Sequence, residues 1–180
     1  MNASEHPAIT IQTIERALQG PLPGEQAQQR MAPVPRSLRP TTPDIPPREG
    51  AVLALLYPHA GELHLALTRR SERLMDHRGQ ISLPGGRREQ TDLTLWDTAL
   101  RETHEELAVD PARVRYIGAL TPLYIPASHY HVHPFVGYVP VRPTFVPNAD
   151  EVAEIIELPL RVLLDPHAKR QETWNWQGKP

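Results

Sequence analysis

Three glutamates, Glu102, Glu105 and Glu106, lie within five positions of one short segment that has helical periodicity. Each residue of an α-helix advances about 100° around the axis, so the three carboxylates share one sector of the helix surface. Like charges this close repel one another, and the negative end of the helix dipole adds to their cost. A divalent cation would reverse both penalties, and Mg²⁺ prefers carboxylate oxygens. The alternative is a solvated helix face neutralised by Arg101 and nearby basic residues.

The segment that precedes these glutamates favours a site over a plain surface. "GQISLPGGRR" places glycines Gly79, Gly85 and Gly86 before the helix, where glycine lets the backbone approach a ligand closely. Arginine side chains, which match phosphate oxygens in a bidentate manner, are frequent here. These arginines are Arg69, Arg70, Arg73, Arg78, Arg87 and Arg88. Carboxylates beside such a loop indicate chemistry on a phosphate ester or anhydride.

Strands on both sides of the loop and helix are expected to position them. "AVLALLYP", from Ala51, has the apolar composition of a buried strand, and "ELHLALTRR", from Glu62, alternates leucines on one face. "HAGE" between them has the composition of a hairpin turn. Later, "VRYIGALTPLYIP", "YHVHPFVGYVPV" and "EVAEIIELPL" predict strands, "LRVLLDP" a helix start and "ETWNW" a last strand. This order predicts a mixed α/β arrangement.

The helix that carries the glutamates is predicted over residues 93–109. Leu95, Ala99 and Leu107 recur at helical spacing and are expected on its inner side. Asp92 is expected at the N-cap, because a side-chain oxygen there can accept a hydrogen bond from the first turn.

The N-terminal part differs from the rest in its proline content. Eight of the 21 prolines lie between Pro21 and Pro47. Proline lacks a backbone donor and fixes φ, so no helix or central strand is expected there. We interpret residues 1–49 as a short docked helix around Ile14 followed by an extended arm, and residues 50–180 as the main domain.

Composition excludes several classes of protein. The net charge of −2 gives no general attraction to nucleic acid or to an anionic membrane, and the absence of cysteine excludes disulfides and thiolate metal sites. The N-terminus lacks signal-peptide features, and no apolar run is long enough to span a bilayer. We expect a soluble cytoplasmic protein of undetermined oligomeric state. The chain ends soon after Trp176, and whether it is truncated at the C-terminus stays open.

The segment around the glutamates resembles the signature of the Nudix hydrolase family. That signature runs Gly, five residues, Glu, seven residues, then Arg-Glu-U-x-Glu-Glu-x-Gly-U, with U aliphatic. Here Gly86 can begin it, and Asp92 takes the place of the first Glu. Eight residues instead of seven then precede Arg101. Thr103 and Ala108 stand where an aliphatic residue and Gly are usual, and Ala108 leaves open whether this turn needs a positive φ.

A second stretch resembles the motif of the coenzyme A pyrophosphatase branch of this family. The motif reads Leu-Leu-Thr-x-Arg-Ser, then His-x-Gly-Gln, then Phe-Pro-Gly-Gly, and Leu83 replaces its Phe. The longer spacing into the helix is also associated with this branch. With "NADEVAEIIELPLRVLLDP" resembling the closing strand and helix, the likeness covers about residues 50–166. The matching residues are Leu67, Thr68, Arg70, Ser71, His77, Gly79, Gln80, Pro84, Gly85 and Gly86.

The resemblance implies a Nudix fold, in which a mixed β-sheet lies between helices as an α/β/α sandwich. It implies hydrolysis, with Mg²⁺ or Mn²⁺, of the pyrophosphate of coenzyme A or its derivatives. The products would be adenosine 3′,5′-bisphosphate and 4′-phosphopantetheine. Free, acylated and oxidised coenzyme A are not distinguished.

The resemblance also gives individual residues a role. The metal ligands and catalytic carboxylates of the helix would be Glu102, Glu105 and Glu106. Arg101 would be a further catalytic group that orients a glutamate through a charge-assisted hydrogen bond. Glu151 is expected as a fourth carboxylate that could deprotonate water, with Glu154 as its alternative. The residues that contact substrate would be Arg70, Arg78, Gly85 and Gly86.

Three other interpretations stay open. "SHYHVHP" places His129, His131 and His133 on one face of a strand, where they could bind Zn²⁺ in a different metallohydrolase. A non-catalytic nucleotide-sensing Nudix domain would share the fold but have no use for the glutamates. A Nudix pyrophosphatase for ADP-ribose or another nucleoside diphosphate derivative would differ only in substrate.

Overall fold

The longest strand among the described residues, β1 (Arg48–His59), lies inside the sheet of the computed structural model, which describes residues 9–32, 45–72 and 79–172. It forms the predicted antiparallel hairpin with β2 (Glu62–Arg70). Ala60 and Gly61, with φ of 49° and 83°, make the connection. Positive φ at both central residues is the geometry that matches the twist of a tight hairpin.

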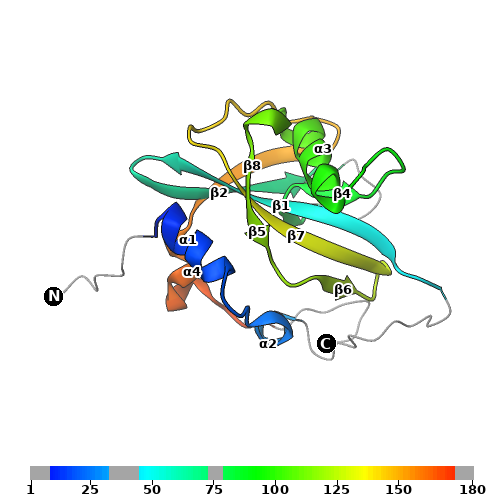
Figure 1. The fold of residues 1–180 in the computed structure, drawn as a ribbon, viewed down its shortest axis with the longest axis horizontal. Coiled ribbons are helices and arrows are strands. Elements are labelled where there is room, and N and C mark those ends of the chain that lie inside the picture. The colour runs from blue at the N-terminus through cyan, green and yellow to red at the C-terminus, as the bar shows by residue number, and fades with distance from the viewer. Residues whose placement is uncertain (1–8, 33–44, 73–78, 173–180) are drawn as a thin grey trace.

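The described residues contain an eight-stranded mixed sheet (Figure 1). Its main path runs β3-β2-β1-β7-β5, and β4, β6 and β8 pair with β1, β7 and β2 respectively. β1 and β7 are parallel, so the sheet is mixed as predicted. The remaining strands are β3 (Ile81–Ser82), β4 (Gly85–Arg87), β5 (Arg115–Ala119), β6 (Leu123–Ile125), β7 (Tyr130–Tyr138) and β8 (Val152–Pro159).

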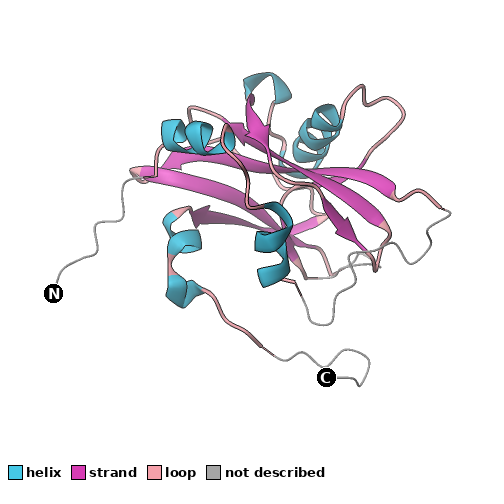
Figure 2. Cartoon of the chain, turned by 60° about the horizontal axis from the view of Figure 1, so that its bottom comes forward, coloured by secondary structure: helices cyan, strands magenta, loops and turns pink. Residues whose placement is uncertain are grey.

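Helices cover both faces of this sheet (Figure 2). Alternate side chains of β1, among them Leu53 and Leu55, pack with Ala99 and Leu107 of α3 (Leu95–Leu107). The intervening side chains, such as Leu56, pack against α1 (Ile11–Leu18). Since strand side chains alternate between faces, α3 and α1 lie on opposite sides. The α/β/α sandwich and the inner side of the glutamate helix are confirmed.

The α1 helix docks on the main body, as its apolar spacing predicts. Ile11, Ile14 and Leu18 pack against the buried cluster on that face of the sheet. Gly118 of β5 lets α1 come close, because a Cβ there would lie 3.1 Å from the Cδ1 of Leu18.

The expectation of no helix in the proline-rich segment is wrong for part of it. α2 (Gly24–Arg30) forms in a stretch free of proline, directly after Pro23 at its N-cap. Proline disrupts helix interiors but is tolerated at a helix start, so spacing between prolines matters more than their number. The Gln28 side chain donates to the Thr121 carbonyl at 2.8 Å and fastens α2 to the loop after β5. Residues 33–44 of the expected arm lie outside the described residues.

The N-cap of α3 is Thr94, so the expectation that Asp92 caps this helix is wrong. Thr94 and Asp97 form a reciprocal capping box, with Asp97 N donating to Thr94 Oγ1 at 3.2 Å and Thr94 N donating to Asp97 Oδ2 at 2.8 Å. At the other end Ala108 adopts φ 57°, so this turn does need the left-handed conformation that the family's Gly provides.

Short helical elements follow, and the C-terminal strand prediction is left open. α4 (Arg161–Leu164) begins where "LRVLLDP" predicts a helix start, and the 3₁₀ turns are η1 (Pro111–Arg113) and η2 (Pro166–Ala168). Most of "ETWNW" falls outside the described residues. Within the described ranges, none of the helices combines the length and apolar character needed to cross a bilayer.

Candidate active site

The α3 helix turns Glu102 toward the glycine pair of β4. A Cβ on Gly86 would lie 2.6 Å from the carboxylate carbon of Glu102, so a side chain there would displace that carboxylate from its present position. Gly85 has φ 149°, and a Cβ there would lie 2.3 Å from the backbone oxygen of Ala51. Gly85 therefore allows β4 to pair closely with β1, while Gly86 makes space for the carboxylate.

Glu106 is the most buried carboxylate of the cluster, with 3% of its surface exposed. Its Oε2 atom is buried and has no hydrogen-bond partner among the described residues. The pKa of Glu106 is raised to about 8, chiefly by burial and then by the charges of Glu102 and Glu151, while Arg70 opposes the shift. Burial also raises the pKa of Glu102 against the opposing charge of Arg101. A cation at this cluster would stabilise the ionised carboxylates and occupy the unpaired oxygen.

Arg101 lies among the acidic groups and holds two of the predicted metal ligands. Its Nη1 atom donates to Glu102 Oε1 at 3.0 Å and to Glu105 Oε2 at 2.9 Å. The Glu105 side chain is 49% exposed, whereas that of Glu102 is 14% exposed. The orienting contact predicted for Arg101 is present, and it reaches two carboxylates instead of one.

Asp92 holds Arg101 from the other side. It accepts hydrogen bonds from Arg101 Nε and Nη2 and also from Thr98 Oγ1 at 2.9 Å and Glu89 N at 2.8 Å. The Arg101 hydrogen bond is the main reason that the pKa of Asp92 falls to about 2. Asp92 thus stays charged and positions Arg101, which fits its alignment with the first Glu of the signature.

The loop before β8 brings Glu151 to the same cluster. Asn148 N donates to the Glu106 carbonyl at 2.9 Å, and Glu151 N donates to the Asn148 carbonyl at 3.0 Å. Ser71 N at the end of β2 donates to the Glu151 carbonyl at 2.8 Å. Because its charge raises the pKa of both Glu102 and Glu106, Glu151 lies within electrostatic reach of these carboxylates.

Glu154, the alternative fourth carboxylate, points to the other face of the sheet. It stands opposite Arg69 in the β2–β8 pair, and Arg69 Nε lies 2.9 Å from its Oε2. Arg69 lies on the same face of β2 as Leu67, because the two are two residues apart. Leu67 packs in the apolar cluster that α1 covers. Glu154 is therefore separated from α3 by the sheet.

Arg70, one residue later, faces α3. Its charge lowers the pKa of Glu106, so the two side chains lie near each other. The Nε atom of Arg70 is buried and finds no hydrogen-bond acceptor in the described part of the chain. A partly buried arginine whose Nε donor has no acceptor in the described residues suits an anionic ligand. Arg78, the other arginine predicted to contact substrate, lies outside the described residues.

Comparison with known proteins fits this geometry. Residues 47–177 match the family model described as NUDIX domain. The chain belongs to the Nudix family. Nudix enzymes generally use divalent metal ions, and the unpaired buried oxygen of Glu106 fits such an ion.

The curated relatives are longer proteins. The chain is 43% identical over 127 residues to an uncharacterized Nudix hydrolase NudL of Pectobacterium atrosepticum, a match that covers 71% of this chain and 64% of that protein. It is 45% identical over 100 residues to a NudL of Yersinia pestis strain Pestoides F, covering 56% and 50% respectively. The matched parts of this Nudix chain thus span about half to two thirds of these relatives.

Solved structures share the Nudix fold at low sequence identity. The Nudix hydrolase RenU from M. smegmatis aligns with a TM-score of 0.55 and 20% identity, over 65% of this chain and 73% of RenU. The NUDIX domain of Shewanella oneidensis NrtR, solved with ADP ribose, aligns with a TM-score of 0.53 and 18% identity, over 77% and 86%. These likenesses confirm the fold.

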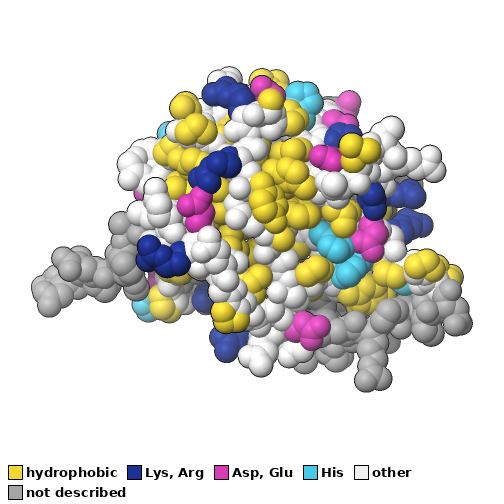
Figure 3. Space-filling view, in the orientation of Figure 1, with side chains coloured by type: hydrophobic (Ala, Val, Ile, Leu, Met, Phe, Trp, Pro, Cys, Tyr) yellow, Lys and Arg dark blue, Asp and Glu magenta, His cyan; other side chains and the backbone are white. Residues whose placement is uncertain are grey.

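Histidines of the "SHYHVHP" segment do not form the predicted three-histidine group in this Nudix chain. His129 has φ 53° and precedes β7, so it leaves the strand alternation, and its ring contacts the Tyr124 hydroxyl at 2.8 Å. His131 and His133 instead meet Glu49 of β1, at 3.5 Å and 2.6 Å. Figure 3 shows histidine side chains against an acidic side chain at the surface.

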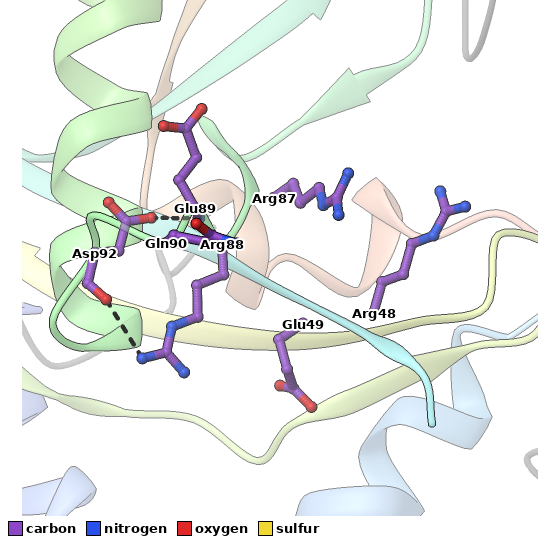
Figure 4. A pocket seen from close by; sticks show the side chains of 7 residues that line it. All are labelled: Arg48, Glu49, Arg87, Arg88, Glu89, Gln90 and Asp92. Carbon is purple, nitrogen blue, oxygen red and sulfur yellow. Dashed lines mark hydrogen bonds between the residues drawn. The ribbon is translucent and has the colours of Figure 1, made fainter. Parts of the chain in front are cut away.

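A pocket of about 360 Å³ lies beside this histidine pair and is formed by β1, β4 and the loop before α3 (Figure 4). Figure 4 shows Glu49 and Arg88 on one side of the β1 ribbon and the side chains of Arg48 and Arg87 on the other. The glutamates of the Nudix helix are not among its lining residues. The lining residues are Arg48, Glu49, Arg87, Arg88, Glu89, Gln90 and Asp92.

Proposed function

We propose that this domain hydrolyses the pyrophosphate of coenzyme A or its derivatives with Mg²⁺ or Mn²⁺. The observation that carries the proposal is the buried Glu106 carboxylate, with an unpaired oxygen, next to Glu102 and the buried Nε of Arg70. Carboxylates suit a hard divalent ion, and the arginine suits the phosphate that such an ion accompanies.

The proposed metal ligands are Glu102, Glu105 and Glu106. A bound divalent ion would neutralise phosphate oxygens and lower the pKa of a water molecule. Glu105 is the most exposed of the three and forms an ion pair with Arg101, so it is suited to the outer edge of the site. Glu102 and Glu106 would form the inner part, since both are largely buried.

The other residues of the chain would hold, orient and accept protons. Arg101 fixes the carboxylates of Glu102 and Glu105, and Asp92 fixes Arg101. Glu151 comes from the loop before β8, not from α3, so it can approach the reacting water from a separate side and take its proton. Arg70 would bind a phosphate oxygen and keep the pyrophosphate in line for attack.

The preference for coenzyme A comes from the second motif. Its Arg70 lies beside Glu106, and its glycine pair forms the space for Glu102. Thus the motif that resembles the coenzyme A branch lines the carboxylate cluster itself. ADP-ribose is the main alternative substrate to test, because the NUDIX domain of NrtR was solved with ADP ribose bound.

One assay panel tests this function. The chain is incubated with coenzyme A, ADP-ribose and a deoxynucleoside triphosphate, each with Mg²⁺ and with Mn²⁺, and products are identified by mass. We expect adenosine 3′,5′-bisphosphate and 4′-phosphopantetheine from coenzyme A, at a higher kcat/KM than for the other two. Faster cleavage of ADP-ribose would overturn the substrate, and binding without turnover of any nucleotide would favour a sensing domain.

Matched variants test the site in the same assay. Glu106→Gln keeps size and removes the charge, so turnover should fall by about 10²–10⁴-fold, the range lost with a catalytic acid–base or electrostatic group. Glu154→Gln removes a carboxylate of the opposite face and should leave turnover within a few-fold. Unchanged turnover in Glu106→Gln would reject the proposed metal ligands.

A further inference from the structure

We propose that Glu49, His131 and His133 form a second metal site, selective for Zn²⁺ or a similar transition-metal ion. The three side chains come from β1 and β7, and each offers one donor atom within 4.8 Å of the other two. They are outside the α3 carboxylate cluster, and their binding of metal does not depend on the proposed hydrolysis.

Strand pairing builds this triad. In the parallel β1–β7 register, Glu49 pairs with His131, and Ala51 pairs with His133. Glu49, His131 and His133 therefore lie on the same face of neighbouring strands, the face that Ala51 shares with α3. The Glu49 carbonyl also accepts a hydrogen bond from Arg88 N at 3.0 Å, which fixes this end of β1. The backbone under all three ligands is thus held by the sheet.

The distances are close to those that a metal requires. Glu49 Oε2 lies 2.6 Å from His133 Nε2, and Glu49 Oε1 lies 3.5 Å from His131 Nδ1. Tetrahedral bonds of about 2.0–2.1 Å to zinc place donor atoms about 3.4 Å apart. Side-chain rotations that lengthen the Glu49–His133 contact and bring His131 to the same carboxylate oxygen would arrange the three donors around an ion.

The donor types distinguish this triad from the cluster on α3. Two imidazoles and one carboxylate form a ligand set that binds zinc and leaves a position for water or another ligand. Imidazole suits Zn²⁺ and its neighbours in the transition series, whereas an all-carboxylate cluster suits Mg²⁺ or Mn²⁺. Excess Mg²⁺ should occupy the α3 cluster and leave the histidine site for Zn²⁺.

The surroundings permit an ion to enter. All three side chains are partly exposed, and Glu49 lines the pocket shown in Figure 4. Arg88, which Figure 4 shows on the same side of β1 as Glu49, is held elsewhere, because its Nη2 donates to the carbonyls of Asp92 and Leu93, each at 3.3 Å. These hydrogen bonds hold the guanidinium group against the loop before α3.

Calorimetric titration with Zn²⁺ tests the site. The chain is first stripped of metal, then supplied with excess Mg²⁺, and titrated above neutral pH. We expect one zinc per chain, retained in Glu106→Gln, which alters only the α3 cluster. Loss of a residue that only supports a metal ligand typically weakens metal affinity by about 10–100-fold. Glu49→Gln and His133→Ala remove ligands themselves, so each should weaken zinc binding by more than that. His129→Ala is the matched control, because that ring lies next to β7 in sequence but contacts Tyr124, and it should bind zinc normally.

Histidine NMR gives a second readout that does not depend on mutant stability. In the unmodified chain, Zn²⁺ should shift the ring signals of His131 and His133 and leave those of His104 in place. The site is rejected if the unmodified chain binds no zinc with Mg²⁺ present, or if Glu49→Gln and His133→Ala, folded by circular dichroism, bind zinc as tightly as the unmodified chain. It is also rejected if the zinc is lost in Glu106→Gln.

Discussion

Arg101 donates to both carboxylate oxygens of Asp92, through Nε at 3.0 Å and Nη2 at 3.1 Å. Asp92 is 7% exposed, so this fork-shaped pair is shielded from water. The pair links the loop that follows β4 to the middle of α3. It also leaves Nη1 of Arg101 directed at Glu102 and Glu105.

The first prediction concerns acid stability and follows from this pair. The folded-state pKa of Asp92 is lowered from 3.8 to about 2, chiefly by Arg101, so Asp92 contributes stability above pH 3.8 that is lost as pH falls toward 2. Asp92→Asn should therefore lower the free energy of unfolding at neutral pH and flatten its acid limb. Urea unfolding at several pH values measures both. Glu89→Gln changes an exposed neighbour and should leave the fall in the free energy of unfolding at acid pH unchanged. The prediction is contradicted if Asp92→Asn and the unmodified chain lose stability equally at acid pH.

The second prediction concerns metal removal. In metal-free protein the pKa of Glu106 is raised from 4.5 to about 8, so the folded chain retains a proton that the unfolded chain has already released. Stability of the chelated protein should therefore fall as pH rises from 4.5 to about 8, and divalent metal should restore it. Thermal unfolding across that range, with chelator or with Mg²⁺, provides the measurement.

Glu106→Gln is the control for the second prediction. Without a titrating carboxyl at this position, the chelated variant should lose less stability across the same pH range. It should also gain less from Mg²⁺. If the variant and the unmodified chain show the same profile in both conditions, the buried carboxyl does not control this dependence.

The third prediction separates the two candidate proton acceptors. Glu151→Gln should lower kcat by about 10²–10⁴-fold, because it removes a carboxylate outside α3 whose charge reaches both Glu102 and Glu106. Glu154→Gln should keep kcat within a few-fold, since an exposed ion pair like Arg69–Glu154 contributes only about 0–1 kcal/mol to stability. The reverse order of the two effects, measured with saturating substrate, would assign the role to Glu154.

The fourth prediction concerns the end of α3. Ala108 is exposed and has φ 57°, a conformation that costs a residue with a Cβ more than it costs Gly. Ala108→Gly should raise the free energy of unfolding by about 0.5–1 kcal/mol, and Ala108→Val should lower it, because a β-branched side chain tolerates this φ least. Urea denaturation of both variants gives the comparison. A stabilising Ala108→Val would disprove the strain.

Local signals predicted much of the fold correctly. The β1–β2 hairpin follows from two apolar runs with Gly61 between them, and the inner face of α3 follows from the spacing of Ala99 and Leu107. Asp92 was harder to place, because a carboxylate near a helix start can cap that helix or bind an arginine. Here Thr94 caps α3, and Asp92 binds Arg101.

Long-range pairings could not be predicted from local pattern. Glu49 meets His131 only because β1 and β7 are parallel neighbours, although a long stretch of chain separates them. The strand alternation that predicted three histidines on one face does not apply to His129, whose φ is 53°. The role of Glu151 stays a prediction from the family resemblance, and Ser71 and Asn148 supply the hydrogen bonds that hold its backbone.

Finally, the docking of α1 bears on how this chain can be shortened. The family match begins at residue 47, yet Ile11, Ile14 and Leu18 of α1 cover Leu56 and neighbouring apolar side chains of the sheet. A chain trimmed to residues 47–177 would keep the α3 carboxylates but expose this apolar face of the sheet to solvent. Such a fragment should self-associate and express poorly. The N-terminal helix therefore keeps the domain soluble by burying apolar side chains of the sheet.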